Sequence, residues 1–322
     1  MKIKKDIYTK SDKKINKGIF PTMVTPFNDK NEIDYRTLSD FIEKFENDGA
    51  DGLFAVCQSS EMFGLGPEEQ TALASFVKNE SKLQVVASGH TQRDPKEQLE
   101  AMKRMAGTGV DAVVLISNAF AGSEETDDAM LRNLDWFLKE FREDVPLGIY
   151  ECPYPYKRLL SEKVLEYIIE TGRFFFLKDT SCDMEIIRKR LGITGSSGFG
   201  LYNANAETLA ESMKAGGSGY SGIHANISVK LVRRVMENPD PRDGLSIKAH
   251  ELLMELSGYL GGAHYPVSAK AMLVDMRVFK GIETRIKNKD CLTLENMARG
   301  KEILKKVLVF EDEFNNESKM RR

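Results

Sequence analysis

Short apolar runs alternate with longer amphipathic segments from Gly18 to His224. Each run precedes a segment in which apolar residues recur at every third or fourth position, as in YRTLSDFIEKFENDG and PKEQLEAMKRMAGTG, a spacing that predicts helices. Eight runs occur, at 18–26, 52–57, 84–89, 112–117, 146–152, 173–179, 198–204 and 219–224. Alternating strands and helices are typical of a parallel sheet, and eight such units close most economically as a (β/α)8 TIM barrel, an α/β fold.

The pattern changes after this region. Segments such as LSIKAHELLMELSGYL and LTLENMARGKEILKKVLVFEDEF have helical spacing with no strand between them. We therefore expect the barrel over residues 18–236 and a C-terminal helical region, an appendage to the barrel, over residues 237–322. Residues 1–17 are rich in lysine and have no apolar core of a signal peptide, so they are interpreted as a basic, solvated leader.

The run at 173–179, RFFFLKD, passes from three phenylalanines to a lysine. Side chains alternate along a strand, so Phe174, Phe176 and Lys178 share one face. In a TIM barrel the active site lies at the carboxyl ends of the strands, and Lys178 stands at such an end. A desolvated lysine has a lowered pKa, and its free amine can attack a carbonyl group to form a Schiff base. The competing interpretation is a lysine that pairs with a carboxylate or extends to water.

Two further segments carry candidate chemistry. Tyr150 lies near the end of the fifth run, where a phenol can pass protons to and from a carbinolamine, although a core tyrosine is equally compatible with the pattern. The loop after the second run, CQSSEMFGLGPEE, offers Ser59, Ser60 and consecutive backbone N–H groups that can hold a carboxylate. Serine-rich turns are common, so this loop is a weak signal by itself.

The amino-acid composition limits the classes of binding partner that we expect. The 322 residues carry a net charge of −3 with a pI near 6.0, 41% hydrophobic and 30% charged residues, which is ordinary for a soluble protein and gives no attraction to nucleic acid or anionic membranes. The four cysteines and four histidines are widely spaced, so we expect no disulfide framework, no metal and no cofactor. No apolar stretch is long enough to span a membrane. A cytoplasmic protein that binds a small molecule is the expectation.

The segment GGSGYSG contains the spacing G-x-G-x-x-G. A dinucleotide fingerprint follows a strand and opens a helix, whereas this segment follows a helix and opens a strand. We therefore reject a nucleotide site. We expect these glycines to allow a tight turn and a close backbone approach beside the last strand.

Five motifs in order resemble the dihydrodipicolinate synthase and N-acetylneuraminate lyase family, the pyruvate-dependent class I aldolases built on a TIM barrel. The motifs are GIFPTMVTPF, CQSSE, IYECP, LKDTS and GGSGYSGIHAN. The resemblance runs from about Gly18 to the helix after Pro266, and the interval from Tyr150 to Lys178 also agrees with the family.

The resemblance implies a role for each matching residue. Lys178 would condense with the keto group of pyruvate or another 2-oxo acid, and Tyr150 would be the acid and base. Ser59, with Gln58 and Ser60 beside it, would bind the carboxylate. An iminium is itself an electron sink, so the reaction needs no metal or cofactor. The family resemblance also implies a homo-oligomer, a tetramer or a dimer. Further residues that would line the site are Thr22, Ser221, Phe120 and residues 203–205.

The chain departs from the family pattern at three places. Gln58 stands where the family loop has its first threonine, and Phe120 stands where the synthase has a second tyrosine, so the two-hydroxyl proton relay of the synthase is missing. Pro155 stands about where the synthase has the arginine that grips its aldehyde substrate, and Arg158 or Lys157 is the candidate substitute. The neighbouring Tyr154 and Tyr156 are expected to form an aromatic wall of the acceptor pocket.

Three functions remain open from the sequence. The first is a Schiff-base lyase or aldolase that acts on pyruvate or another 2-oxo acid with an unidentified aldehyde or sugar acid. The second is 4-hydroxy-tetrahydrodipicolinate (dihydrodipicolinate) synthase of lysine biosynthesis. The third is a non-catalytic sensor or scaffold that binds a 2-oxo acid. The absent relay hydroxyl at Phe120 supports the third, whereas the presence of both Lys178 and Tyr150 opposes it.

Overall fold

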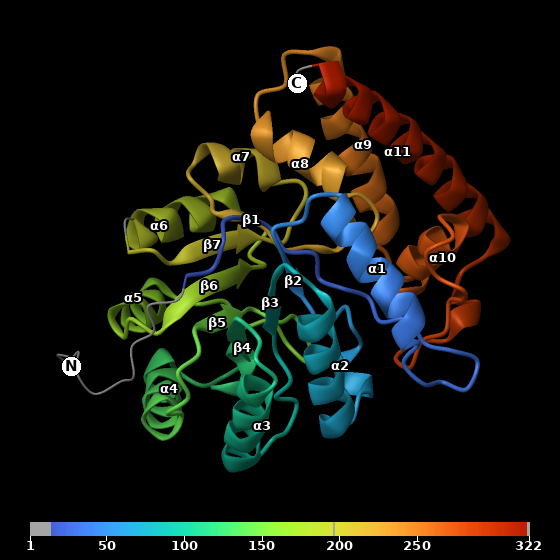
Figure 1. The fold of residues 1–322 in the computed structure, drawn as a ribbon. Coiled ribbons are helices and arrows are strands. Elements are labelled where there is room, and N and C mark those ends of the chain that lie inside the picture. Colours follow the sequence, from blue (N-terminus) through green and yellow to red (C-terminus); the bar gives the residue numbers. More distant parts are fainter. Residues whose placement is uncertain (1–13, 196, 321–322) are drawn as a thin grey trace.

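A computed structural model describes residues 14–195 and 197–320. Eight parallel strands form one sheet in the order β1-β8-β7-β6-β5-β4-β3-β2, and a parallel bridge between Thr22 and Phe54 brings its two edges together. The predicted TIM barrel is confirmed (Figure 1). The strands are β1 (Gly18–Ile19), β2 (Gly52–Phe54), β3 (Gln84–Ala87), β4 (Ala112–Ile116), β5 (Leu147–Tyr150), β6 (Phe174–Asp179), β7 (Gly200–Asn203) and β8 (Gly219–Tyr220).

A helix follows each strand and lies on the outside of the barrel, so the strands occupy the centre of Figure 1. Side chains of Asp94 and Thr126 accept hydrogen bonds from the first turns of two of these helices, as expected for N-caps. The helices are α1 (Tyr35–Asn47), α2 (Pro67–Glu80), α3 (Pro95–Gly107), α4 (Asp127–Glu140), α5 (Glu162–Glu170), α6 (Met184–Thr194), α7 (Leu209–Lys214) and α8 (Val229–Glu237). Short 3-10 turns are η1 (Met62–Gly64), η2 (Ser117–Ala119), η3 (Ile223–Asn226) and η4 (Lys289–Cys291).

The first and last strands are shorter than the apolar runs that predict them. In each, only two residues pair as a strand. Beyond them, the side chain of Asn226 takes over the hydrogen bonding: its amide oxygen accepts from the Val24 N–H at 3.1 Å and its amide nitrogen donates to the Thr22 carbonyl at 2.8 Å. The carboxyl ends of these runs are therefore loops at the barrel mouth.

The glycines beside the last strand confirm the predicted close approach. A Cβ atom on Gly219 would lie 1.9 Å from the Gly18 carbonyl oxygen, and one on Gly222 would lie 2.3 Å from the Tyr220 hydroxyl. Both distances are far below van der Waals contact. Glycine at 219 lets β1 and β8 pair where the barrel closes, and glycine at 222 leaves room for the Tyr220 side chain and the Ala204 carbonyl.

Aromatic rings fill the interior of the barrel. The ring of Phe176 lies 4.3 Å from that of Tyr202, 5.7 Å from that of Phe20 and 6.0 Å from that of Phe54. These rings come from four different strands or strand ends, as in the packed core of a TIM barrel. Lys178 shares the inward face with Phe176, so its side chain stands directly above this apolar layer.

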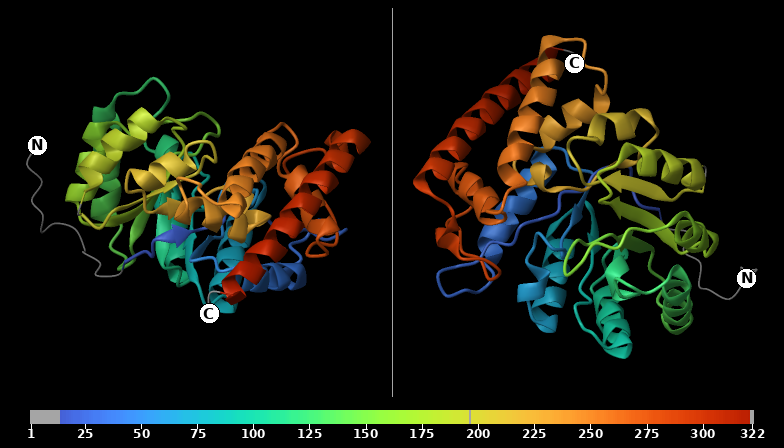
Figure 2. Two further views of the ribbon diagram at one scale, coloured as in Figure 1. Left: turned by 90° about the horizontal axis from the view of Figure 1, so that it is seen from above. Right: turned by 180° about the vertical axis from the view of Figure 1, so that it is seen from behind.

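Three helices complete the chain, α9 (Gly244–Leu260), α10 (Val267–Asp275) and α11 (Leu294–Met320). Figures 1 and 2 show them together on the side of the barrel where α1 and α8 lie. The ring of Phe279, after α10, packs 5.1 Å from that of Phe41 in α1. The C-terminal helices are thus present as expected, and the division at residue 236 stays a prediction.

The N-terminal leader falls largely outside the described residues, because residues 1–13 are not among them. Its last part, from Lys14 to Lys17, runs past the barrel, where Gln84 bonds the Asn16 N–H and the Lys14 carbonyl at 2.7 and 2.9 Å. Within the described ranges, no helix is both long and apolar enough to cross a bilayer.

A buried arginine joins the carboxyl ends of two neighbouring strands. Arg190 of α6 donates to both carboxylate oxygens of Glu151, at 2.5 and 3.1 Å, and also to the carboxylate of Asp179. All three side chains are excluded from solvent. Burial raises the pKa of Glu151, and the guanidinium opposes that rise. Glu151 follows Tyr150 and Asp179 follows Lys178, so this Arg190 clamp fixes the segments that carry both candidate catalytic residues.

We predict that Arg190→Ala destabilises the fold by about 3–5 kcal/mol, because two buried carboxylates lose their partner. Arg188→Ala is the matched control on the same helix, since its exposed side chain approaches Glu211 only at 3.8 Å and its loss is expected to change stability by less than about 0.5 kcal/mol. Urea unfolding of the two variants measures the difference. Equal unfolding midpoints would contradict the clamp.

Candidate active site

Lys178 is enclosed at the carboxyl end of β6, with 5% of the residue exposed. Its Nζ lies 4.2 Å from the centre of the Tyr150 ring and 5.8 Å from that of Phe54. Among the described residues, no carboxylate lies within salt-bridge distance of Nζ. Burial lowers the pKa of Lys178, and the nearby Cys57 and Cys152 oppose the shift. This environment favours the neutral, nucleophilic amine over a lysine held in an ion pair.

Tyr150 is the direct neighbour of Lys178 in the sheet. The two residues are partners in the parallel register of β5 and β6, so both side chains point into the barrel. The Tyr150 hydroxyl donates to Oε1 of Gln58 at 3.3 Å. Burial raises the pKa of Tyr150 well above its ordinary value, with smaller contributions from Cys152 and Cys57. The phenol therefore stays protonated at neutral pH.

The loop after β2 brings Gln58 and Ser59 to the same place. The Ser59 hydroxyl donates to Oγ1 of the buried Thr22 at 3.3 Å. Ser60 instead folds the loop: its hydroxyl accepts from the Cys57 N–H at 2.6 Å and donates to the Cys57 carbonyl at 2.7 Å. The backbone N–H groups of residues 58–60 donate to no described group. They remain available to an anion beside Lys178.

A buried ion pair anchors this loop. Lys270 of α10 donates to Glu61 at 2.5 Å, and both side chains are fully buried. The Glu61 carboxylate also accepts from the Thr284 hydroxyl at 2.8 Å and from the Arg285 N–H at 2.6 Å. Sequence reasoning missed this anchor, because nothing in the spacing of Lys270 and Glu61, 209 residues apart, connects them.

One cavity of about 780 Å³ joins four of the predicted residues: Gln58, Ser59, Tyr150 and Lys178. Three more predicted residues do not line it. Thr22 contacts the cavity only indirectly, because its hydroxyl accepts from Ser59. The Ser60 hydroxyl bonds the backbone of its own loop. The buried Ser221 hydroxyl has no partner in the described part of the chain. Of residues 203–205, Asn203 bonds the Thr208 and Ser212 hydroxyls, while Ala204 and Asn205 line the cavity. Its other lining residues include Lys157, Glu207, Ile223, His224 and Tyr265.

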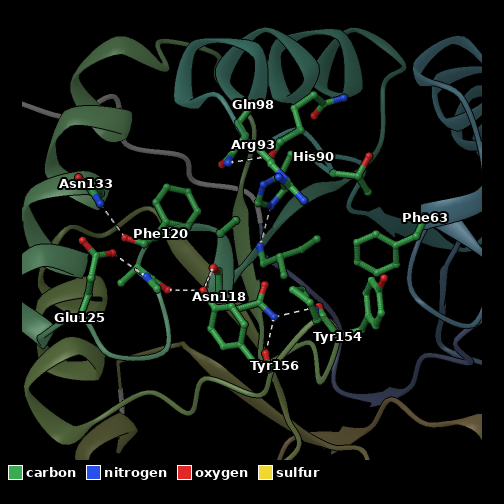
Figure 3. A pocket seen from close by; sticks show the side chains of 17 residues that line it. Phe63, His90, Arg93, Gln98, Asn118, Phe120, Glu125, Asn133, Tyr154 and Tyr156 are labelled. Atoms are coloured by element: carbon green, nitrogen blue, oxygen red, sulfur yellow. Dashed lines mark hydrogen bonds between the residues drawn. The ribbon is translucent and has the colours of Figure 1, made fainter.

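Phe120 lies in a different cavity, shown in Figure 3, which corrects its predicted place. Its ring packs 5.5 Å from that of Phe137 and 5.9 Å from that of His90. Without a hydroxyl, this ring has no polar group to satisfy and is buried against α4. Tyr154 and Tyr156 also line this second cavity of about 530 Å³ and not that of Lys178, so the expected aromatic wall of the acceptor pocket is wrong.

The structure separates the two candidate substitutes for the missing arginine. Arg158 turns away from the cavity of Lys178, donating to the Gly122 carbonyl at 2.7 Å and pairing with Asp127 at 3.3 Å. Lys157 lines that cavity, and its Nζ donates to the Thr180 carbonyl at 2.8 Å. Of the two candidate substitutes, Lys157 is therefore the one that lines the cavity of Lys178.

Comparison with known proteins identifies the family. The model of the Dihydrodipicolinate synthetase family matches residues 15–285. The chain belongs to this family. The resemblance seen in the sequence is therefore confirmed. Members of the dihydrodipicolinate synthetase family are pyruvate-dependent lyases and aldolases that act through a lysine Schiff base, and this chain is an enzyme of that class.

Relatives of this family resemble the chain at low identity. The 4-hydroxy-tetrahydrodipicolinate synthase of Natronomonas pharaonis is 26% identical over 244 residues, which are 74% of this chain and 79% of that protein. Among solved structures, dihydrodipicolinate synthase from Acinetobacter baumannii in complex with pyruvate has a TM-score of 0.79 at 20% identity, covering 91% of this chain and 98% of that one. CdNal from Clostridium difficile in complex with mannosamine has a TM-score of 0.78 at 19% identity, covering 90% and 98%. These structures share the fold.

We predict that Lys178→Met makes the fold more stable at neutral pH. The pKa of Lys178 is lower in the folded chain than in the unfolded one, so the unfolded chain binds more protons between the two values and the stability of the wild type rises with pH across that window. Below the folded pKa the buried ammonium carries its full penalty. The melting temperature of Lys178→Met should exceed that of the wild type at pH 7.

The stability that Lys178→Met gains over the wild type should shrink as the pH approaches the ordinary lysine pKa of about 10.4. Lys157→Met is the control, because Lys157 is exposed and its replacement should give no pH-dependent gain. Calorimetry across pH 7 to about 10 measures both variants. A Lys178→Met protein that is less stable than the wild type at pH 7 would contradict a desolvated amine.

Proposed function

We propose that this chain is a Schiff-base class I aldolase or lyase in which Lys178 condenses with pyruvate or another 2-oxo acid, and Tyr150 moves the protons. The second substrate is an aldehyde or a sugar acid. One observation carries the proposal: a buried amine with no described counter-ion stands beside a protonated phenol at the mouth of a closed barrel. Binding of pyruvate by the Acinetobacter baumannii relative supports the donor.

The loop after β2 would hold the carboxylate of the 2-oxo acid. Gln58 and Ser59 line the cavity, and their backbone N–H groups have no acceptor in the described residues; such neutral donors stabilise an anion without a metal. With the carboxylate there, the keto carbon meets Nζ of Lys178. Gln58 and Ser59 thus orient the substrate while Lys178 reacts.

Lys178 then supplies both the nucleophile and the electron sink. Its neutral amine attacks the keto carbon, and the carbinolamine loses its hydroxyl as water after Tyr150 donates a proton. The resulting iminium accepts the electron pair when the adjacent carbon loses a proton or when its bond to the aldehyde carbon breaks. The enamine so formed attacks an aldehyde in the synthetic direction. Gln58 accepts the Tyr150 hydrogen bond but is no acid, so the relay ends there.

Trapping with borohydride tests Lys178. With pyruvate and sodium borohydride, we expect one reduced adduct for each chain, on the peptide that contains Lys178. Lys178→Arg should abolish the adduct, because a guanidinium stays protonated. Lys157→Arg, which changes a second lysine of the same cavity, should keep it. Peptide mass spectrometry reads the site. An unmodified wild type, or an adduct on another lysine, would remove the proposal.

The names of the curated relatives favour a second candidate, 4-hydroxy-tetrahydrodipicolinate synthase. Lys157 fits this candidate, since it can meet the carboxylate of aspartate semialdehyde. Gln58 and Phe120 oppose it, because neither side chain can pass a proton and Phe120 lies in the other cavity.

A coupled assay of pyruvate with aspartate semialdehyde separates these candidates. We expect turnover no higher than the background of Lys178→Arg, because the relay of the synthase is absent. Turnover well above this background in the wild type would establish the synthase instead. A Lys178 adduct without turnover on any aldehyde or sugar acid would favour the non-catalytic sensor.

We also propose that the protein acts in the cytoplasm as a homo-oligomer, a tetramer or a dimer. Membership of the dihydrodipicolinate synthetase family supports both the location and the assembly.

A further inference from the structure

The Tyr265 hydroxyl is a buried polar group that the proposed reaction leaves unexplained. Tyr265 lies between α9 and α10 and lines the cavity of Lys178. Its hydroxyl is shielded from solvent and makes no hydrogen bond of acceptable distance and angle within residues 14–195 or 197–320, although the Ser59 side chain lies near it. Burial raises the pKa of this phenol, so it remains a donor across the physiological range. A donor buried without a partner costs about 1–3 kcal/mol, and a ligand that accepts its hydrogen bond would recover this cost.

The surroundings of this hydroxyl indicate where that ligand lies. The Ser59 side chain is close enough to act on the phenol and to oppose the rise of its pKa, and Tyr265 in turn adds to the raised pKa of Tyr150. The Ser59 hydroxyl donates to Oγ1 of Thr22 at 3.3 Å, which leaves the phenol proton of Tyr265 for an acceptor in the cavity. Tyr265 is therefore near both Ser59 of the loop after β2 and Tyr150, and it lines the same cavity as Lys178.

Tyr265 and Tyr150 are the two phenols that line the cavity, and their tasks differ. Tyr150 contacts Lys178 and donates to Gln58, whereas Tyr265 faces Ser59 and has no described acceptor. We propose that the Tyr265 hydroxyl donates a hydrogen bond to the carboxylate of the bound 2-oxo acid and selects substrates that carry this group. This inference rests on the proposed function.

A neutral donor suits this place for an electrostatic reason. The carboxylate already lies beside the positive iminium that forms on Lys178, and a lysine or arginine in place of Tyr265 would repel that iminium. A phenol adds a hydrogen bond without adding charge. Tyr265 contributes to binding before and after the imine forms, so its loss should raise the half-saturating substrate concentration more than it lowers the saturated rate.

The test is Tyr265→Phe, which keeps the ring and removes the hydroxyl. Borohydride trapping on Lys178 is measured against the concentrations of pyruvate and of methyl pyruvate, whose ester has no anionic carboxylate. We expect the half-saturating pyruvate concentration to rise about tenfold or more, with trapping at saturation preserved. Methyl pyruvate should show little change. Tyr202→Phe is the control, because it removes a phenol hydroxyl that bonds Asn16 outside the cavity.

Each other outcome overturns the inference. An unchanged pyruvate dependence in Tyr265→Phe removes the hydrogen bond to the carboxylate. An equal loss with pyruvate and methyl pyruvate, or an equal loss in Tyr202→Phe, indicates a structural role only. A wild type that forms no adduct with either compound overturns the proposed function and this inference with it, whereas a trapped wild type with an unaltered variant overturns the role of Tyr265 alone.

Discussion

The register between β5 and β6 is the constraint on which the site depends. It pairs Tyr150 with Lys178 and so sets the phenol ring 4.2 Å from the amine. The Arg190 clamp locks this register from outside the barrel, because it binds the residue that follows each of them. A shift of one residue in either strand would turn one of the two side chains out of the barrel.

The alternation of side chains along β6 explains why Lys178 has no counter-ion among the described residues. Asp179 follows Lys178 directly, yet its carboxylate points to the other face, where Arg190 neutralises it. Inside the barrel, Lys178 meets aromatic rings and thiols instead. The sheet thus separates two neighbours in sequence into one paired carboxylate and one desolvated amine.

The sequence predicted the fold because hydrophobic spacing follows directly from which face of an element is buried. It also predicted that Lys178, Tyr150, Gln58 and Ser59 lie together, since carboxyl ends of parallel strands in a closed barrel meet at one mouth. Their chemical roles remain proposals.

The geometry of the loops could not be predicted from hydrophobic spacing. Phe120 follows β4 and the short turn η2, and its ring packs against Phe137 of α4, a contact that no periodicity describes. Tyr265 lies in a region interpreted as helical packing, and a tyrosine before Pro266 between two helical segments was its one signal. The sequence suggests Ser60 as a substrate ligand, yet its hydroxyl forms hydrogen bonds with the Cys57 backbone of its own loop.

The most direct measurement is a crystal structure of the protein soaked with pyruvate. We expect continuous density from Nζ of Lys178 to the keto carbon, with the carboxylate at Ser59 and the Tyr150 hydroxyl near the new bond. Pyruvate bound elsewhere, or an unmodified Lys178 at saturating pyruvate, would contradict this expectation.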